Sequence, residues 1–380
     1  MQSAIPFNKP YLSGAETSYI EEAVRSGKIS GDGKYTRLCH KFFEHRYNFK
    51  KVLLTTSCTD ALELAAILLD IEPGDEVIMP AYTFVSTANA FVLRGAHIVF
   101  ADSNPDNPNL DVDTLEALIT PRTKCIVPVH YAGIACDMVK LMSIASKYNL
   151  WVVEDAAQAI ESYCNGQPLG SFGHMAAFSF HETKNIISGE GGMLVINDDR
   201  FIERAEIIRE KGTNRSAFFR GEVDKYGWVD IGSSFLPSDI IAAFLYAQLE
   251  NIDDIQKKRI AIWNSYQSRL SARLNDYGVR TPRIPSYATN NAHMYYLVCK
   301  NLEQRSGLIE YLRENGVHTV FHYLSLEKSP YYKEKHDGRS LFWSDFYADR
   351  LLRLPLYYEL GIDEVNYISD LILRFIEKSL

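Results

Sequence analysis

Two residues of this chain could do chemistry together, a lysine and an aspartate that each follow a short apolar run. Lys184 comes after Ala176–Phe180 and before the loop Gly189–Gly192, and Asp155 ends the run that begins at Trp151. A lysine can hold the aldehyde of pyridoxal phosphate as an imine, and a buried acid can keep the pyridine nitrogen of that cofactor protonated. Either residue alone has a simpler explanation, because most lysines are solvated and an aspartate often caps a helix. The pair favours a pyridoxal phosphate site.

Hydroxyl, amide and aromatic side chains near this pair could complete such a site. Thr56–Leu62 joins a predicted strand to a predicted helix, and the free N–H groups at the start of a helix can bind phosphate. A plain capping segment without a ligand explains the same residues equally well. Ser179 offers a second hydroxyl, and Gln158, one turn after Asp155, could contact the ring hydroxyl. Phe84 could stack on a planar ring, although an aromatic residue there is more often part of the core.

Composition narrows the class of protein. The chain has 380 residues, of which 46% are hydrophobic and 23% are charged, as in ordinary globular proteins, and this length predicts two domains. The formal net charge is -8 and no run of lysines or arginines occurs, which argues against nucleic acid and anionic membrane partners. The six cysteines show no zinc or disulfide spacing, and the segment His181–Lys184 lacks the second histidine of a zinc helix. We therefore expect no metal site.

The apolar stretches of the sequence are short and interrupted. None approaches the roughly 20 residues that a membrane-spanning helix needs. The first residues, Met1–Pro6, lack the charged and apolar regions of a signal peptide. We expect a cytoplasmic protein with reduced thiols.

From about residue 51, short apolar runs alternate with longer amphipathic segments. The expected strands are 52–55, 76–79, 98–101, 125–129, 151–153, 176–180 and 193–196, and the expected helices are 59–69, 86–93, 111–118 and 139–147. This alternation predicts an α/β fold with a mostly parallel sheet covered on both faces. Ligands bind at the carboxyl ends of such strands, where 55–60, 82–84, 154–158 and 180–184 fall.

The last third of the chain has a different pattern. Residues 239–274 are helical in period but broken near Asn251. We place a domain boundary there, with residues 1–250 forming a large cofactor-binding domain and residues 251–380 a smaller C-terminal α/β domain. In the smaller domain we expect a strand over 294–299 and helices over 305–315 and 363–378.

Taken together, these motifs resemble the DegT/DnrJ/EryC1/StrS family of sugar aminotransferases, and the similarity covers nearly the whole chain. The matching segments are Ser57–Leu62, Pro80–Asn89, Glu154–Gln158, Ser179–Lys184 and Gly189–Gly192. Members of this family are pyridoxal phosphate enzymes of fold type I that act on nucleotide-linked keto-sugars. The resemblance thus implies a large domain with a mostly parallel sheet and a smaller C-terminal α/β domain.

The resemblance also implies a role for each residue of the ring site. Lys184 would form the imine with the cofactor and move the proton. Asp155 would pair with the pyridine nitrogen, Gln158 would contact the ring, and Phe84 would cover one face of the ring.

Three residues fall where the family binds the cofactor phosphate, namely Cys58, Thr59 and Ser179. Cys58 is a departure, because a glycine is more usual at this position. Ser234 is a second departure, because many members carry an asparagine there that reaches the phosphate of the partner subunit. The shorter serine puts this contact between subunits in doubt.

Within the family, further segments are similar to members that aminate C4 of dTDP-4-keto-6-deoxyglucose to dTDP-4-amino-4,6-dideoxygalactose. These segments are Lys28–Arg37, Asp75–Gly95, Pro128–Gly133, Ile207–Arg220, Asp230–Ser234 and Leu351–Tyr357. The implied reaction has two halves, in which L-glutamate aminates the cofactor and the cofactor aminates the sugar. Lys184 would protonate C4 from one face and so set the galacto or gluco product. The resemblance further implies a homodimer and a role in lipopolysaccharide or surface polysaccharide biosynthesis.

The same lysine also bears on which activity of this fold the chain has. Sugar dehydratases of the fold carry a histidine in place of Lys184, so the lysine favours amination. A non-catalytic, pyridoxal phosphate-binding regulator is a further alternative, and the intact pair of Asp155 and Lys184 argues against it. The gluco product, a UDP carrier and amination at C3 stay open.

The diphosphate of a nucleotide-sugar substrate must meet cations although the chain is net acidic. Candidates are Arg215, Arg220 and Lys225, in a loop rich in glycine and aromatic residues, and a solvated loop surface is the alternative. His293 and His322 could line the sugar pocket from the smaller domain. A core or surface position explains these two histidines equally well.

Overall fold

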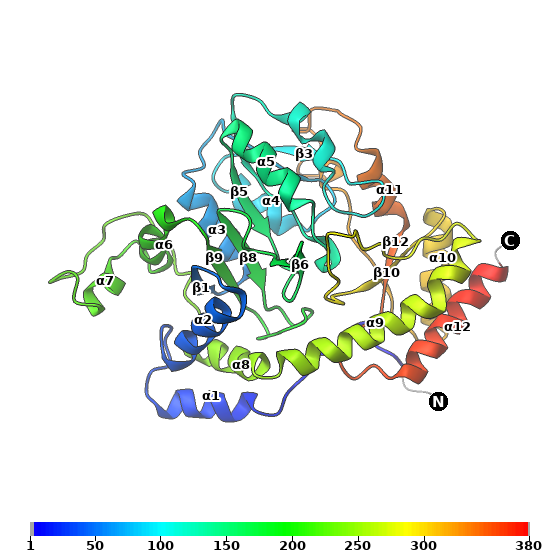
Figure 1. The fold of residues 1–380 in the computed structure, drawn as a ribbon, viewed down its shortest axis with the longest axis horizontal. Helices are drawn as coiled ribbons and strands as arrows, with labels where there is room; N and C mark the ends of the chain where they lie inside the picture. The colour runs from blue at the N-terminus through cyan, green and yellow to red at the C-terminus, as the bar shows by residue number, and fades with distance from the viewer. Residues whose placement is uncertain (1–3, 379–380) are drawn as a thin grey trace.

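The computed structural model describes residues 4–378, and its centre is a seven-stranded sheet in the order β1-β9-β8-β5-β4-β2-β3 (Figure 1). The strands are β1 (Lys51–Thr55), β2 (Glu76–Pro80), β3 (His97–Ala101), β4 (Thr123–Ile126), β5 (Trp151–Asp155), β8 (Met175–Ser179) and β9 (Gly192–Ile196). Of these seven strands, β9 runs antiparallel to both its neighbours, β1 and β8, and the other six point in one direction. The predicted mostly parallel sheet is confirmed.

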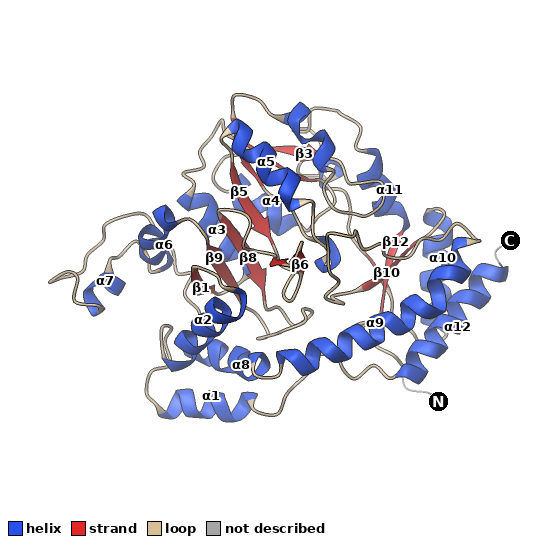
Figure 2. Ribbon diagram, in the orientation of Figure 1, coloured by secondary structure: helices blue, strands red, loops and turns tan. Residues whose placement is uncertain are grey.

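Helices cover both faces of this sheet because each strand buries side chains on both sides (Figure 2). Along β1, Val52 and Leu54 belong to one apolar cluster and Leu53 to another, as the two-residue period of a strand requires. The first cluster also takes residues from α2, α5 and α8, and the second takes residues from α3, α4 and α6. These helices are α2 (Lys34–Tyr47), α3 (Cys58–Leu68), α4 (Val85–Val92), α5 (Met138–Tyr148), α6 (Ile202–Arg209) and α8 (Asp239–Leu249).

A smaller antiparallel sheet in the order β10-β12-β11 lies in the last third of the chain. Its strands are β10 (Tyr295–Val298), β11 (Val320–Phe321) and β12 (Leu351–Leu354), and the helices around it are α9 (Ile252–Asn275), α10 (Leu302–Glu314), α11 (Phe342–Arg350) and α12 (Ile362–Lys378). A third apolar cluster joins Tyr266 of α9 to Leu297, Leu352 and Ile372. The long helix α9 leads from the large sheet to this part of the molecule (Figure 1). The predicted break near Asn251 lies between α8 and α9.

The first 50 residues hold elements that the sequence analysis did not predict. Helix α1 (Glu16–Arg25) packs along α8, and α2 packs on β1. Ahead of them, Ile5 forms a bridge with Val317, so the start of the chain lies against the last third, although the predicted boundary assigns it to the first domain. Residues expected to be helical over 111–118 form a 3-10 helix, Val112–Leu118.

The remaining short elements are connections. They are the hairpin β6 (Tyr163–Cys164) and β7 (Gln167–Pro168), the helix α7 (Arg215–Phe219), and the 3-10 helices Tyr131–Gly133, Asp199–Phe201 and Leu326–Lys328. Over residues 4–378 every helix is too short or too polar to cross a bilayer. Strands β1, β2, β5 and β8 run parallel within the sheet, so the loops that follow them leave at one edge.

Candidate active site

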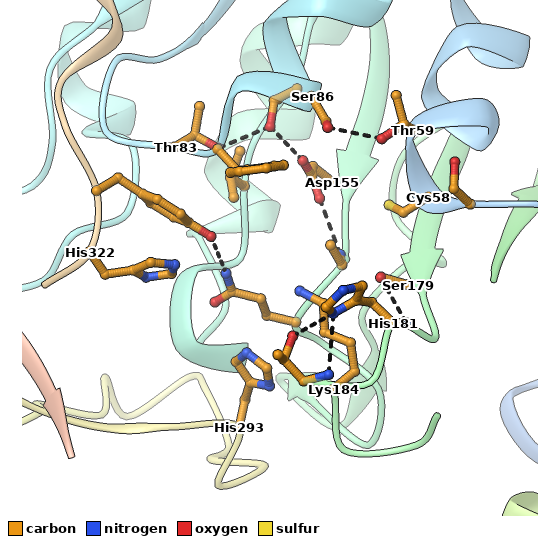
Figure 3. A pocket seen from close by; sticks show the side chains of 18 of the residues that line it. Cys58, Thr59, Thr83, Ser86, Asp155, Ser179, His181, Lys184, His293 and His322 are labelled. Atoms are coloured by element: carbon orange, nitrogen blue, oxygen red, sulfur yellow. Dashed lines mark hydrogen bonds between the residues drawn. The ribbon is translucent and has the colours of Figure 1, made fainter. Parts of the chain in front are cut away.

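A cavity of about 590 Å³ opens at this edge of the sheet (Figure 3). The loops after β1, β2, β5 and β8 form most of its wall, and the smaller sheet closes it from the other side. Nine of the residues singled out from the sequence line this cavity: Cys58, Thr59, Phe84, Asp155, Gln158, Ser179, Lys184, His293 and His322. Residues up to 264 positions apart in the chain, from Cys58 to His322, therefore share one site.

Lys184 lies in the loop between the antiparallel strands β8 and β9. The loop is closed by backbone hydrogen bonds, in which Phe180 N–H donates to the Gly191 carbonyl (2.8 Å) and Glu182 N–H to the Gly189 carbonyl (2.9 Å). Burial lowers the pKa of the Lys184 amine, and the guanidinium of Arg353 lowers it further, whereas Cys58 and Asp155 oppose the shift. A neutral amine is the form that attacks an aldehyde or accepts a proton, so the cavity prepares Lys184 for either task.

Close packing explains the glycine that begins β9, Gly192. A Cβ on Gly192 would lie 2.4 Å from the carbonyl carbon of Ser57 and 2.5 Å from the backbone nitrogen of Cys58. Such distances are shorter than van der Waals contact, so only glycine lets β9 approach the start of α3. Gly192 thereby lets the Lys184 loop and the start of α3 share the same cavity.

Asp155 ends β5 with only 5% of its surface exposed. Its carboxylate accepts hydrogen bonds from the Thr87 hydroxyl (2.7 Å) and from the Ala157 N–H (3.1 Å). Burial raises the pKa of Asp155, and the two hydrogen bonds and Lys184 act in the opposite direction. No helix begins in residues 156–162, so a helix cap does not explain this aspartate. A buried carboxylate on a cavity wall can pair with a cationic ring nitrogen.

The preceding residue, Glu154, points to the other side of β5 and is fully buried. One of its oxygens accepts from Phe172 N–H (2.8 Å) and Gly173 N–H (2.7 Å), and the other accepts from Gly170 N–H (2.8 Å) and His130 Nε2 (2.9 Å). Glu154 thus holds the segment before β8 against β5, and Asp155 alone of this acidic pair faces the cavity.

Gln158 is fixed by both ends of its side-chain amide. Its Oε1 accepts from Ala132 N–H (2.7 Å), and its Nε2 donates to the hydroxyl oxygen of Tyr323 (3.2 Å). Phe84 precedes α4 with 55% of its surface exposed, and its ring centroid lies 6.0 Å from that of Tyr323. An exposed ring on a cavity wall can stack on a flat ligand.

Hydroxyl groups gather at the start of α3. The Oγ of Ser57 accepts from Asp60 N–H (3.0 Å) and caps this helix, while Thr59 Oγ1 lies 2.9 Å from Ser86 Oγ (Figure 3). Ser179, at the end of β8, lines the same side of the cavity. Hydroxyls combined with a helix start suit a phosphate group.

Both candidate histidines of the smaller domain lie in the cavity wall. His293 Nδ1 is 2.9 Å from Asn185 Oδ1, and His322 Nδ1 is 3.1 Å from the Tyr131 hydroxyl. Burial lowers the pKa of each histidine well below its usual range, and the neighbouring cations lower it further. Both rings are therefore neutral near pH 7.

The candidate cations of the 215–225 loop lie elsewhere. In this chain α7 and its flanking loops project away from the sheet (Figure 1). Arg220 pairs with Glu206 (2.7 Å) and Glu222 (2.7 Å), and Arg215 packs over the ring of Phe219. Arg215 and Arg220 line a separate cavity of about 750 Å³. Lys225 and Ser234 are exposed and line neither cavity.

Several residues of the cavity were missed by the sequence analysis. They are Thr87, His181, Glu190, Tyr323 and Arg353. The one with a readable signal is Arg353, which interrupts the apolar run Leu351–Leu356. A cation within an apolar strand is unusual, and it could have been singled out on that ground.

Comparisons with known proteins agree with this geometry. A model of the DegT/DnrJ/EryC1/StrS aminotransferase family matches residues 10–373. The spore coat polysaccharide biosynthesis protein SpsC of Bacillus subtilis is 33% identical over 96% of this chain and 95% of its own length. The PLP form of Spr1654 from Streptococcus pneumoniae superposes with a TM-score of 0.90 at 27% identity, covering 99% of this chain and 100% of that one. The aminotransferase TlmJ from Streptoalloteichus hindustanus gives 0.91 at 28% identity, with both chains fully covered.

These similarities extend over the whole fold, including the cavity and both sheets. They confirm the predicted enzyme class, an aminotransferase, and its cofactor, pyridoxal phosphate. The chain belongs to the DegT/DnrJ/EryC1/StrS aminotransferase family.

Proposed function

We propose that this sugar aminotransferase moves the amino group of L-glutamate to C4 of dTDP-4-keto-6-deoxyglucose, giving dTDP-4-amino-4,6-dideoxygalactose. The observation that carries the proposal is that a half-buried Lys184 and a buried Asp155 line the same cavity. The choice of sugar is supported by the subgroup resemblance of segments such as Lys28–Arg37 and Leu351–Tyr357. The similarity to SpsC supports a role in making a surface polysaccharide.

The residues of the cavity fit pyridoxal phosphate. Asp155 would hold the pyridine nitrogen, Gln158 would contact the ring, and Phe84 would cover one ring face. Thr59, Ser179 and the backbone N–H of Cys58 would hold the phosphate at the start of α3. Three different chemical needs of one ligand are thus met by groups that the fold brings to one cavity. When bound, the cofactor withdraws electrons from the carbon that loses or gains a proton.

The chain's own residues then divide the remaining work. Lys184, whose pKa is lowered by burial, takes a proton from the donor carbon and returns one to C4 of the sugar. Hydrogen bonds from Thr87 and Ala157 hold the carboxylate of Asp155 in place, so it need not move when it pairs with the pyridine nitrogen.

The neutral ring of His293 can orient a sugar hydroxyl through Nε2, because its bond to Asn185 uses only Nδ1. His322 would line the sugar pocket beside it, with its ring held by Tyr131 and Arg353.

The second copy of a homodimer would complete the site. Trp228 is 83% exposed, and Phe219, Val229 and Ile231 near it are also exposed, which is unusual for apolar side chains that face only water. The projection of α7 away from its own cavity supports contact with a second chain (Figure 1). In such a dimer Arg215, Arg220 and Lys225 would meet the nucleotide diphosphate in the partner cavity, and Ser234 would lie near its phosphate site.

The decisive experiment is to incubate the purified protein with pyridoxal phosphate, L-glutamate and dTDP-4-keto-6-deoxyglucose. We expect 2-oxoglutarate to form with one equivalent of amino sugar, and NMR coupling constants to give the galacto configuration at C4. A gluco product, or turnover only with a UDP sugar or a 3-keto sugar, would move the assignment to one of those alternatives. Loss of water from the sugar without amination would identify a dehydratase. Bound cofactor without any turnover would identify a regulator.

A further inference from the structure

A buried chain of side-chain amides joins the loop of Lys184 to the smaller domain. Its members are Asn185, which follows Lys184 directly, Gln256 on α9, and Asn291, and all three are buried. Asn291 stands two residues before His293, in the segment that leads to β10. The amides therefore connect the two walls of the cavity from below.

The backbone carbonyl of Asn291 fixes how these amides are turned. Nδ2 of Asn185 donates to this carbonyl (2.8 Å), and Nε2 of Gln256 donates to it as well (2.5 Å). Nδ2 of Asn185 also donates to Oε1 of Gln256 (3.2 Å). A carbonyl oxygen cannot donate, so turning the Asn185 amide would place two acceptors against each other. Oδ1 of Asn185 is thus left to face His293.

The orientation of Asn185 decides which nitrogen of His293 carries the proton. Oδ1 of Asn185 lies 2.9 Å from Nδ1 of His293, and an amide oxygen only accepts, so Nδ1 donates. Burial and the neighbouring cations lower the pKa of His293 well below its usual range, so the ring carries no second proton near pH 7. Nε2 of His293 is therefore an acceptor.

The backbone of His293 is held as firmly as its ring. Its N–H donates to Oδ1 of Asn291 (2.9 Å), and its carbonyl accepts from Nη2 of Arg259 (2.8 Å). The ring lines the active-site cavity, and within residues 4–378 its Nε2 has no hydrogen-bond partner (Figure 3). Among the cations that lower its pKa, Lys184 has the largest effect. The free acceptor therefore lies near the carbon on which Lys184 acts.

We propose that Asn185 positions His293 to accept a hydrogen bond from the 3-hydroxyl of the keto-sugar. This assignment rests on the proposed function, because it takes C4 as the carbon that reacts at Lys184. In dTDP-4-keto-6-deoxyglucose, C4 is bonded to C3, which carries a hydroxyl, and to C5, which carries a methyl group and the ring oxygen. The 3-hydroxyl is thus the donor next to the reacting carbon. A fixed acceptor discriminates against a ligand without this donor, because the acceptor then stays unpaired.

The two half-reactions should respond differently to the loss of this acceptor. L-glutamate has no hydroxyl, and its amino group is transferred to the cofactor. The acceptor at Nε2 of His293 therefore serves the half that consumes the sugar. A residue that only supported the fold would affect both halves together.

The first arm of the test needs no substitution. Wild-type enzyme loaded with pyridoxamine phosphate is given dTDP-4-keto-6-deoxyglucose or its 3-deoxy analogue, and the second-order rate constant is measured for each sugar. The same ratio is measured for His293→Phe and Asn185→Leu, with Asn275→Leu at the exposed end of α9 as a matched control. The L-glutamate half is followed by the loss of cofactor absorbance in single-turnover reactions. NMR shifts of the isotopically labelled ring nitrogens, recorded without substrate, report which nitrogen of His293 carries the proton.

We expect the wild-type enzyme to use the 3-deoxy sugar about tenfold less efficiently than the parent sugar. His293→Phe should lose the same factor with the parent sugar and no longer distinguish the two, while its L-glutamate half stays within about threefold of wild type. Asn185→Leu should lose most of the discrimination, a ratio that a general loss of activity does not change. The NMR signals of His293 should show a proton on Nδ1 in wild type and in Asn275→Leu, and a mixture of tautomers in Asn185→Leu.

Three results would overturn the assignment. A proton on Nε2 of His293 in the wild-type enzyme would contradict the role of Asn185. Equal use of the two sugars by the wild type would exclude the 3-hydroxyl as the partner. Equal loss of both half-reactions in His293→Phe would make the role of this histidine structural. A wild-type enzyme that aminates neither sugar would refute the proposed function itself, which is a distinct outcome.

Discussion

Glu154 and Asp155 are adjacent buried acids, and replacing each by its isosteric amide should give opposite results. All four groups that donate to Glu154 are N–H groups, three from the backbone and one from His130, whose Nδ1 already accepts from Cys136 N–H. In Glu154→Gln one end of the side chain becomes a donor, so two buried N–H groups lose their acceptor whichever way the amide is turned. Each lost acceptor costs about 1–3 kcal/mol, so the total is about 2–6 kcal/mol.

The partners of Asp155 can adapt to an amide. In Asp155→Asn the Oδ1 still accepts from Ala157 N–H, and the Nδ2 can donate to the Thr87 hydroxyl, which in turn donates to Thr83, 2.9 Å away. A hydroxyl can exchange its role of donor for that of acceptor, and a backbone N–H cannot. Stability should therefore be kept within about 1 kcal/mol. Activity should fall at least about 100-fold, because the charge that pairs with the pyridine nitrogen is gone.

Thermal unfolding followed by circular dichroism, together with steady-state turnover, separates these outcomes. For a chain of this length a loss of about 4 kcal/mol corresponds to a fall in Tm of about 5 °C. We expect this fall for Glu154→Gln and a wild-type Tm with little turnover for Asp155→Asn. The reasoning is refuted if Glu154→Gln unfolds at the wild-type temperature, or if Asp155→Asn keeps full activity.

Three further predictions follow from the same structure. Burial lowers the pKa of Lys184 in the folded protein below the value of about 10.4 in an unfolded chain. The folded state therefore binds this proton more weakly than the unfolded state does. As a result, the contribution of Lys184 to the free energy of unfolding rises with pH up to about 10.4. Cofactor-free Lys184→Met should thus be more stable than wild type near neutral pH by a margin that closes above about pH 10.4, as denaturant titrations across pH can show; a constant margin would contradict the shift. Gly192→Ala should destabilise the protein by about 1–3 kcal/mol and weaken cofactor binding, since its Cβ would meet the backbone of Ser57, while Gly227→Ala, with open space around its Cβ, should behave as wild type. Trp228→Ser should shift sedimentation from dimer to monomer, and an unchanged wild-type dimer would remove this surface from the interface.

The fold and the cofactor side of the cavity could be predicted because their signals are local. Alternating apolar runs mark the strands, and strands that run parallel must end at one edge, so Thr59, Asp155 and Lys184 could be brought together without coordinates. Their separation along the chain does not matter once the order of elements is known. What local patterns could not decide is which of two adjacent acids faces the cavity, because that depends on the register of β5.

The substrate side of the cavity was less predictable. Arg353 reaches it through the pairing of β12 with β10 and β11, and such long-range pairings leave little mark on the sequence near residue 353. The 215–225 loop differs from Arg353, because its composition suggested a ligand-binding role. In the structure, however, this loop projects away from the active-site cavity of its own chain (Figure 1). A contact that involves a second chain cannot be read from the periodicity of one.

The antiparallel course of β9 has a mechanical consequence. Both ends of the loop that carries Lys184 are paired to each other, through Ser179 and Gly192, and each strand is also paired to another neighbour in the sheet. This loop cannot swing outward as a hinged flap does without breaking the ladder on both sides. The backbone at Lys184 therefore stays fixed during each catalytic cycle. The parts that move are the lysine side chain and the molecules that enter and leave the cavity.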